Sequence, residues 1–511
     1  MTAANITFYE RVEDALKDKK LHDALELATT RFVTLRAQGF SSLPEIEALR
    51  DHARRIRAHT LANLDRYLAQ FAEVVEANGG HICWAETPED ANRYVVELAR
   101  ARGVKSIVKS KSMISEELEI NHELEAAGVR VVETDLGEYI IQLAHEKPSH
   151  IIAPVIHKSR QQIADLFREK LNATDADLAD VPSMTALARR LLRADFLRAD
   201  MGISGVNFGV AETGSICLVT NEGNGRLTTT TPRIHVAMMG LERLVPTIED
   251  LGVMLQLLAR SATGQKLSVY SNIITGPRRR DEEAAERGGE ETTTSNPKSK
   301  IPEGHDVQNP KSDEPDGPDE LHIIILDNGR SKVLGSEMAE ILYCIRCGAC
   351  LNICPVYQQI GGHGYGSVYP GPVGAVLTPG LFGLELWSDL PHASSLCGAC
   401  REVCPMRIDI PRMLLKLRDE AAKVGKTPAW LKLGLRLYSF AVVRPWLYRL
   451  GGQLSRIGAS LLAKNGWINK LPGPLAAWTD HRDFPAFAPK SFSQRWGKRE
   501  GTEGTHRNLG F

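Results

Sequence analysis

The sequence CIRCGACLNICP occupies residues 344–355, and CGACREVCP occupies residues 397–405. Together these stretches hold seven of the nine cysteines in a chain of 511 residues. The first follows the spacing C-x2-C-x2-C-x3-C-P, in which three close thiolates bind one iron-sulfur cluster and the fourth reaches a neighbouring cluster. The second matches the last three positions of that run, with Ser394 where the first cysteine would stand. This related pair of runs predicts a domain with two iron-sulfur clusters.

Crossed ligation divides the seven cysteines between the two clusters. One 4Fe-4S cluster is assigned to Cys344, Cys347, Cys350 and Cys404. The second cluster is left with Cys354, Cys397 and Cys400. Three thiolates hold either a 3Fe-4S cluster or a 4Fe-4S cluster with a non-cysteine ligand or an open iron. His363 and Ser394 are weak candidates for that place, since a lone loop histidine is more often not a ligand and a hydroxyl binds iron far less readily than a thiolate.

Structural zinc is the alternative use of such cysteines. Zinc sites also contain C-x2-C pairs, but tetrahedral zinc gains nothing from a third cysteine followed by Cys-Pro. Two iron-sulfur clusters in one small domain favour a one-electron relay, whose potentials depend on cluster type, exposure and hydrogen bonds to sulfur. We expect the backbone amides of Gly348 and Gly398 to donate such bonds.

The composition is that of a soluble globular protein, with 43% hydrophobic residues and a formal net charge of -1. This balance gives no general attraction to nucleic acid. The N-terminus lacks the pattern of a signal peptide, and no run approaches the roughly 20 apolar residues that span a bilayer. We therefore expect a cytoplasmic protein without disulfides or a transmembrane segment. Cys83 and Cys217 lie in apolar runs and are predicted core residues.

Four regions follow from the patterns along the chain. Residues 1–79 are predicted to be helical, and residues 80–335 alternate strands with helices, which indicates an α/β domain with a mostly parallel sheet. One of the expected strands is HIIAPVI at residues 150–156. Residues 278–320 are rich in charge, Pro, Gly and Thr, so we expect a disordered insertion there. Residues 336–415 form the predicted α-helical ferredoxin domain, and a helical tail occupies residues 416–511.

Longer motifs resemble one family. The stretches CIRCGACLNICPVY, GGHGYGSVYPGPVGAVLTP and SSLCGACREVCP look like the LutB family, and so do VKSKSM, ETDLGEYIIQLA and AETGSICLVTNEGNGRL upstream. The resemblance covers about residues 40 to 425, although the charged insertion is longer here. It implies a LUD domain similar to the sugar-isomerase and CoA-transferase superfold, followed by an α-helical ferredoxin domain. It also implies the same division of the seven cysteines.

The function that the resemblance implies is that of an iron-sulfur electron-transfer subunit in a complex that oxidises L-lactate to pyruvate. The implied partners are a cysteine-rich subunit and a LUD-only subunit, with a quinone-linked or other electron acceptor. One alternative is an enzyme with acyl or hydroxy-acid chemistry in the α/β domain, and another is an assembly scaffold with structural clusters. Whether this chain is itself an enzyme stays open.

The α/β region offers three candidate sites. NEGNGR places Glu222, Asn224 and Arg226 around two glycines, a turn suited to a carboxylate or phosphate, or equally a surface hairpin. Glu212 stands at a strand end, where fold analogy suggests a base or nucleophile. KSKS at residues 109–112 supplies Lys109, Ser110, Lys111 and Ser112, either as an anion site before a helix or as a solvated turn. No nicotinamide, flavin or P-loop fingerprint is present.

The tail contains an amphipathic helix. Trp430, Leu433, Leu437, Phe440 and Ala441 share one face, and Lys432, Arg436 and Ser439 lie opposite. We expect this face to dock on the ferredoxin domain or on a companion subunit. The alternative is a shallow helix at a membrane surface, with Pro445 limiting its length.

Overall fold

The computed structural model describes residues 7–278, 317–425, 429–479 and 482–496. Most of the expected disordered insertion lies outside these residues. The chain divides into two compact units, residues 1–424 and residues 425–511. The first unit contains the α/β and cysteine regions, and each unit is described by itself.

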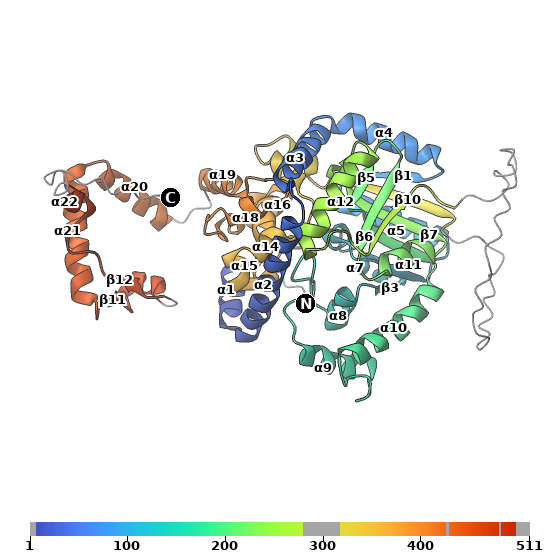
Figure 1. Ribbon diagram of the computed structural model, residues 1–511, viewed down its shortest axis with the longest axis horizontal. Coiled ribbons are helices and arrows are strands. Elements are labelled where there is room, and N and C mark those ends of the chain that lie inside the picture. The colour runs from blue at the N-terminus through green and yellow to red at the C-terminus, as the bar shows by residue number, and fades with distance from the viewer. Residues whose placement is uncertain (1–6, 279–316, 426–428, 480–481, 497–511) are drawn as a thin grey trace, which may run out of the picture. The chain divides into compact units, whose positions relative to one another are not determined.

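The N-terminal region is helical, as predicted. Its helices are α1 (Phe8–Lys17), α2 (Lys19–Ser41), α3 (Ile46–Ala62) and α4 (Leu64–Ala77). Thr7 begins α1 with a capping box in which its backbone N–H binds the Glu10 carboxylate at 2.6 Å. The long helix α2 runs between the α/β part and the cysteine region (Figure 1) and contacts helices of both. This region therefore joins the two parts of the unit.

A six-stranded parallel sheet forms the centre of the α/β part. Its strands are β1 (His81–Ala85), β2 (Ser106–Lys109), β3 (Arg130–Glu133), β4 (Met201–Gly205), β7 (Ile234–Gly240) and β10 (Glu320–Leu326). They lie in the order β1-β10-β7-β4-β2-β3, and all of their pairings are parallel. Every residue of β7 is buried, as expected for a strand covered on both faces. The predicted α/β class with a parallel sheet is confirmed.

Helices follow most of these strands. They are α5 (Pro88–Ala101), α6 (Met113–Glu117), α7 (Ile120–Ala126), α8 (Leu136–Ala144), α9 (Arg160–Leu171) and α10 (Val181–Arg198). The stretch SMISEELEINHELEAAG at residues 112–128 has the pattern of a single helix, but it forms the two helices α6 and α7. The break falls at Glu119, whose φ of 51° is left-handed and cannot continue an α-helix.

A second sheet of four short strands was not predicted. It contains β5 (Phe208–Val210), β6 (Ser215–Thr220), β8 (Leu244–Val245) and β9 (Tyr270–Ile274), in the order β8-β5-β6-β9. Cys217 is fully buried in β6 and is the core residue expected, whereas Cys83 in β1 is only partly buried. Two helices accompany this sheet, α11 (Asn224–Thr230) and α12 (Ile248–Thr263).

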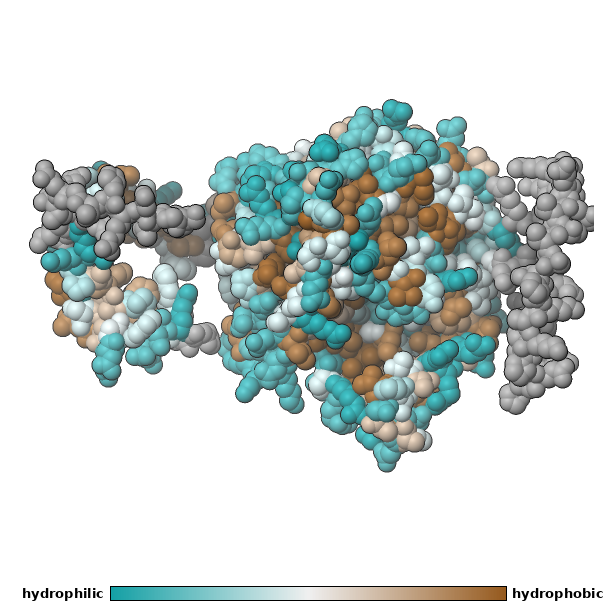
Figure 2. Space-filling view, in the orientation of Figure 1, coloured by the Kyte–Doolittle hydropathy of each residue, from teal (hydrophilic) through white to brown (hydrophobic). Residues whose placement is uncertain are grey.

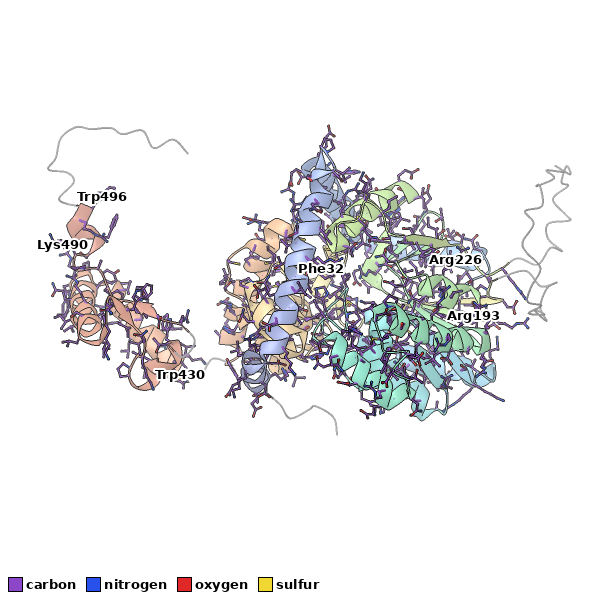
Figure 3. The ribbon with its side chains drawn as sticks, turned by 60° about the horizontal axis from the view of Figure 1, so that its bottom comes forward. Phe32, Arg193, Arg226, Trp430, Lys490 and Trp496 are labelled. Atoms are coloured by element: carbon purple, nitrogen blue, oxygen red, sulfur yellow. The ribbon has the colours of Figure 1, made fainter. Side chains whose placement is uncertain are left out.

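The predicted strand at residues 150–156 is wrong, because this segment forms turns. The His150 ring causes the bend, since its Nδ1 accepts the backbone N–H groups of Ile152 and Ala153 at 3.0 and 3.1 Å. The same ring stacks on Phe32 of α2, with ring centroids 6.0 Å apart. Phe32 lies near the middle of that helix (Figure 3). The buried His150 ring therefore accepts the backbone N–H groups that would pair with a neighbouring strand if this segment were a strand.

The cysteine region is mostly helical. It contains α13 (Arg330–Leu334), α14 (Ala349–Asn352), α15 (Pro355–Tyr365), α16 (Gly371–Phe382), α17 (Leu384–Trp387), α18 (Ala399–Val403) and α19 (Ile410–Lys423). One hydrophobic core includes Phe71 of α4, Leu257 of α12 and Leu351 of α14. The cysteine helices are thus packed on the α/β part.

The second unit contains α20 (Ala429–Val442), α21 (Pro445–Leu462), the strands β11 (Trp467–Ile468) and β12 (Phe484–Pro485), and α22 (Phe492–Trp496). Apolar and polar side chains are mixed on its visible surface (Figure 2). Trp430 and Trp496, on α20 and α22, are exposed (Figure 3). Within the described ranges, no helix has both the length and the apolar character needed to cross a bilayer.

Candidate iron-sulfur centre and the adjoining cavity

The two cysteine runs fold into similar loops. Gly348 and Gly398 have φ values of 74° and 86°, a left-handed conformation that glycine adopts without strain. Each glycine starts a short helix, α14 or α18, and these two helices contact each other. The two runs are therefore brought together although about forty residues separate them.

Four thiols form a first group, Cys344, Cys347, Cys350 and Cys404. Burial, together with the charges of Cys344 and Cys404, raises the pKa of Cys347 to about 12. Burial also raises the pKa of Cys404 to about 11, with Cys344 again a contributor. Cys404 thus meets the thiols of the other run rather than only those of its own. This neighbourhood is compatible with crossed ligation, which stays a prediction.

The remaining three thiols form a second group. Burial raises the pKa of Cys400 to about 12, and the charges of Cys354 and Cys397 add to this rise. Cys397 is exposed, so the second group reaches the surface of the unit. Cys350 of the first group also senses the charge of Cys400. The two groups therefore approach each other on the side of Cys350 and Cys400.

The surroundings of the thiols suit an iron-sulfur cluster. Backbone N–H groups face the sulfur atoms, and they belong to Arg346, Ala349, Val356, Tyr357, Arg401, Met406 and Ile408. The expected donors were Gly348 and Gly398, but the amide that faces Cys347 is the next one along, that of Ala349. Such bonds stabilise the negative charge of a cluster. Since the buried thiols hold their protons, cluster assembly must release them.

Arginines of the N-terminal helices hold the second run in place. Arg36 of α2 donates to the Val403 carbonyl at 2.6 Å. Arg50 of α3 donates to the carbonyls of Glu402 and Cys404 at 2.6 and 2.7 Å. Burial lowers the pKa of Arg36 to about 10, and the thiolate of Cys347 opposes that change. These guanidinium groups place positive charge beside the first group.

Neither of the two candidates from the sequence, Ser394 and His363, has described contacts that direct it to the second group. The Ser394 hydroxyl accepts the Leu396 N–H at 3.1 Å, which forms a local turn. His363 directs Nε2 to the Lys147 carbonyl at 2.6 Å and packs against His157, so its described contacts lie elsewhere. The buried Tyr365 hydroxyl faces Cys354, where it favours the thiolate against the effect of burial.

Comparison with known proteins agrees with this arrangement. A LUD domain model matches residues 68–292, a 4Fe-4S dicluster domain matches residues 340–408, and the C-terminal domain of lactate utilisation protein B matches residues 417–501. Lactate utilization protein B of Bacillus cytotoxicus is 43% identical over 486 residues, which is 95% of each chain. Lactate utilization protein B 2 of Bacillus mycoides matches equally well. The chain belongs to the lactate utilization protein B family.

The family match confirms the resemblance read from the cysteine motifs, and the dicluster domain confirms iron-sulfur clusters as its cofactors. Among solved structures, a DUF162 family protein from Deinococcus radiodurans covers 52% of this chain and 98% of its own, with 12% identity and a TM-score of 0.25. That similarity is too low to define the fold of the LUD domain.

In this family member, a cavity of about 220 Å³ lies between the LUD part and the cysteine region. Its lining includes five of the predicted α/β residues and one residue of the first cysteine run, namely Ser110, Lys111, Ser112, Glu222, Asn224 and Arg346. NEGNGR is not a hairpin, because Asn224 begins α11. Arg226 lies on the exposed side of that helix and is absent from the cavity lining. The fold thus brings residues of two predicted candidate sites to one cavity, and their role in binding stays a prediction.

Two of the predicted α/β residues have structural partners instead. Lys109 is fully buried and pairs with Glu116 and Glu133 at 2.8 and 2.7 Å, so it is not an anion site. Burial lowers the pKa of Lys109, but these carboxylates outweigh it and raise the pKa overall. The Glu212 carboxylate accepts the Ile248 N–H at the start of α12, 3.3 Å away. It is not part of the cavity lining.

A buried charge network lies beside the cavity and was not predicted. Arg330 binds Glu117 through two nitrogens and Glu242 through Nε. Glu242, in the turn Leu241–Arg243, also accepts from Arg346 at 3.4 Å. The Tyr369 hydroxyl binds Glu117. The network thus connects the carboxyl ends of the parallel strands to Arg346, one of the two residues between Cys344 and Cys347. No sequence spacing reveals this link.

Proposed function

We propose that the chain relays electrons one at a time between two iron-sulfur clusters, as the iron-sulfur subunit of a complex that oxidises L-lactate to pyruvate. The contact between α14 and α18, the helices that carry Cys350 and Cys400, supports this proposal most directly. A relay needs two redox centres close together in protein, whereas structural clusters need no such neighbour. The curated relatives carry the name lactate utilization protein B, which supplies the substrate.

The proposed ligands of the first cluster are Cys344, Cys347, Cys350 and Cys404. Those of the second are Cys354, Cys397 and Cys400, with 4Fe-4S or 3Fe-4S composition. The thiols of the first cluster are buried or partly buried and lie near Arg36 and Arg50, while Cys397 is exposed at the second. Electrons would therefore enter or leave through the second cluster. We propose a companion subunit of the complex as the partner there, and a quinone-linked or other acceptor beyond it.

The α/β part is proposed to share the superfold of sugar isomerases and CoA transferases. The six-stranded parallel sheet is compatible with that assignment at the level of class. The alternative function, acyl or hydroxy-acid chemistry with Glu212 as base, has little support. The Glu212 carboxylate is occupied at the start of α12 and lies outside the cavity that adjoins the first thiol group.

We also propose that the protein is cytoplasmic and that its C-terminal unit attaches to an anionic membrane surface. Helix α20 has no buried residue. The exposed fractions of Trp430, Leu437 and Trp446 are 74%, 61% and 65%. Neither α20 nor α21 contains Asp or Glu, whereas both contain Arg. Exposed apolar side chains with positive charge favour an interface with anionic lipid.

Anaerobic purification followed by iron and sulfide quantitation tests the relay. We expect up to about eight iron atoms per chain, or about seven with a 3Fe-4S cluster. Electron paramagnetic resonance during a reductive titration should then show two reversible signals. Zinc without acid-labile sulfide, or clusters that cannot be reduced at biological potentials, would refute the relay.

A further inference from the structure

The cavity lies where parallel α/β sheets bind ligands. In the order β1-β10-β7-β4-β2-β3, the chain runs from β2 outward to β3 and then returns to β4 on the other side of β2. The segments after β2 and β4 therefore diverge, and a crevice forms at their carboxyl ends. Ser110 and Lys111 from the first segment, and Val206 and Asn207 from the second, line the cavity. Its position is thus that of a ligand site by topology alone.

A buried guanidinium provides a second, independent indication. Arg346 lines the cavity, although its side chain is only 7% exposed. Its Nη2 reaches Glu242 at 3.4 Å, and its guanidinium lies 4.8 Å from the centre of the Tyr369 ring. Its Nη1 has no hydrogen-bond partner among the described residues. A buried donor without an acceptor is costly, so an acceptor supplied by a ligand would stabilise this arrangement.

Buried arginines gather beside the cavity. Four buried arginines, Arg57, Arg243, Arg330 and Arg346, lie in one network with two buried glutamates, Glu117 and Glu242. Arg57 donates only to backbone carbonyls, including that of Leu342 at 2.8 Å. Arg243 lines the cavity beside Arg346 and donates to the Cys344 carbonyl at 3.2 Å. The charged residues of the lining itself are balanced, three positive and three negative, namely Lys111, Arg243, Arg346, Asp135, Glu222 and Glu242. The unpartnered Nη1 of Arg346, rather than an excess of positive charge, therefore favours a ligand with an anionic acceptor.

The remaining lining limits the size and chemistry of the ligand. Leu218, Leu258 and Ala262 supply an apolar wall, and the Ser110 and Ser112 hydroxyls supply polar contacts. A space of about 220 Å³ is small for a dinucleotide but suits a short organic acid. A carboxylate also matches the planar guanidinium better than a single point acceptor does.

We propose that this cavity binds a small 2-hydroxy or 2-oxo monocarboxylate, with its carboxylate on Arg346 and Arg243. The choice of this acid class rests on the proposed function, because the substrate of the complex and its product are such acids. The ligand would lie beside the loop that carries Cys344 and Cys347. This inference concerns binding alone and assigns no chemical step to the cavity.

Calorimetric titration of the full chain, purified anaerobically with both clusters, tests the proposal. We expect saturable binding of L-lactate or pyruvate, with acetate and inorganic phosphate at least tenfold weaker. Arg346→Gln should weaken binding at least tenfold. Its matched control is Arg401→Gln, since Arg401 lies beside Cys400 but is 61% exposed and outside the cavity. That control should bind the acid as the unaltered chain does.

Cluster content separates the outcomes. If Arg346→Gln loses iron, the binding of the acid is measured in Ala262→Leu instead. This variant fills the apolar side of the cavity away from the cysteines. Unchanged affinity for the acid in Ala262→Leu would overturn the proposal. No saturable binding of either acid, or tighter binding of phosphate, would also overturn it. Binding in a chain whose clusters show no reversible resonance signal would support the cavity while refuting the relay. Redox-active clusters in a chain that binds neither acid would support the relay while refuting the cavity proposal.

Discussion

Arg330 binds Glu117 through both terminal nitrogens, at 2.9 and 2.7 Å, and neither side chain is exposed to solvent. Arg330 follows the last parallel strand, and Glu117 ends α6 after the second. Burial disfavours the charged form of each side chain. At Glu117 the opposite charge and the hydrogen bonds of Arg330 outweigh burial, so the pKa of Glu117 stays below its usual range. The pair therefore stabilises the carboxyl edge of the sheet, and the cysteine region contacts this edge.

Removal of this buried guanidinium should destabilise the protein strongly. Arg330→Met leaves Glu117 and Glu242 without their partner, and breaking a buried pair typically costs about 3–5 kcal/mol. Chemical denaturation followed by circular dichroism measures the free energy of unfolding. Arg102→Met is the matched control, because Arg102 pairs with Glu320 at 2.7 Å while 47% exposed. That variant should lose less than about 1 kcal/mol. Equal losses in both variants would contradict the prediction.

Crossed ligation predicts that a cysteine of the second run supports the first cluster. Cys404→Ala should abolish the resonance signal of the first cluster and keep that of the second, although Cys404 follows Cys397 and Cys400 in sequence. Cys397→Ala should do the opposite. Cys217→Ala, in the buried strand β6, should leave iron and sulfide content unchanged. If Cys404→Ala removed the same signal as Cys397→Ala, the two runs would each bind their own cluster.

The sequence predicted the centre better than its surroundings. The cysteine spacing is set by the size of a compact cluster, so the groups around Cys347 and Cys400 could be expected without a structure. The main sheet was also expected, because short strand-like runs alternate with helical patterns along this part of the chain. Lys109 fits neither expectation, an anion site or a solvated turn, since it is buried and its partner Glu133 lies on another strand. Pairing between distant polar residues has no signature in local sequence.

The same limit explains the other differences. The strand expected at residues 150–156 is absent because the His150 ring bonds to the backbone of its neighbours, a contact that apolar periodicity does not register. The strands β5 and β8 are two or three residues long, too short for an alternating pattern. Arg346 could have been noticed as a basic residue between two predicted cluster ligands, but its contact with Glu242 can be recognised only in the folded structure.

Tyr365 should tune the second cluster. Its hydroxyl is buried and lies near Cys354 without an ordinary hydrogen bond to another described residue. A hydroxyl that donates to a ligand sulfur stabilises the reduced cluster. Tyr365→Phe should therefore lower the midpoint potential of the second cluster, by roughly 40 mV for a bond of about 1 kcal/mol. Redox titration with resonance detection measures this change.

The first cluster provides the internal control for this variant, because its potential should stay the same. Tyr357→Phe is a matched aromatic variant, since the Tyr357 hydroxyl donates to the Ser149 carbonyl at 2.8 Å rather than to a thiol. A second-cluster potential that rises or does not move in Tyr365→Phe would contradict the prediction.

Stability should fall in mild acid because of His235. This side chain is fully buried in β7, with Nε2 2.8 Å from the Ser204 hydroxyl. Burial, helped by His322, lowers the pKa of His235 to about 3. The unfolded chain binds a proton below about pH 6.5 that the folded chain excludes, so this contribution is complete above that pH and is lost progressively towards pH 3.

The free energy of unfolding should therefore drop by about 1.4 kcal/mol per pH unit for this group, below about pH 6.5. In His235→Gln the free energy of unfolding should change less steeply with pH between about pH 7.5 and about pH 5.5. Denaturation curves at each pH measure it. His122→Gln, at an exposed position of α7, should keep the full slope. A slope unchanged in His235→Gln would place the acid sensitivity elsewhere.

The C-terminal unit should bind membranes through α20 and α21. We expect the full chain to sediment with vesicles that contain phosphatidylglycerol but not with purely zwitterionic vesicles, and salt should weaken the binding. The double variant Trp430→Ser and Trp446→Ser should bind less, because these exposed rings supply the apolar contact. Leu386→Ser is the control, since Leu386 is 81% exposed on α17 of the other unit. Binding that ignores lipid charge and survives the double variant would instead favour a protein partner for this surface.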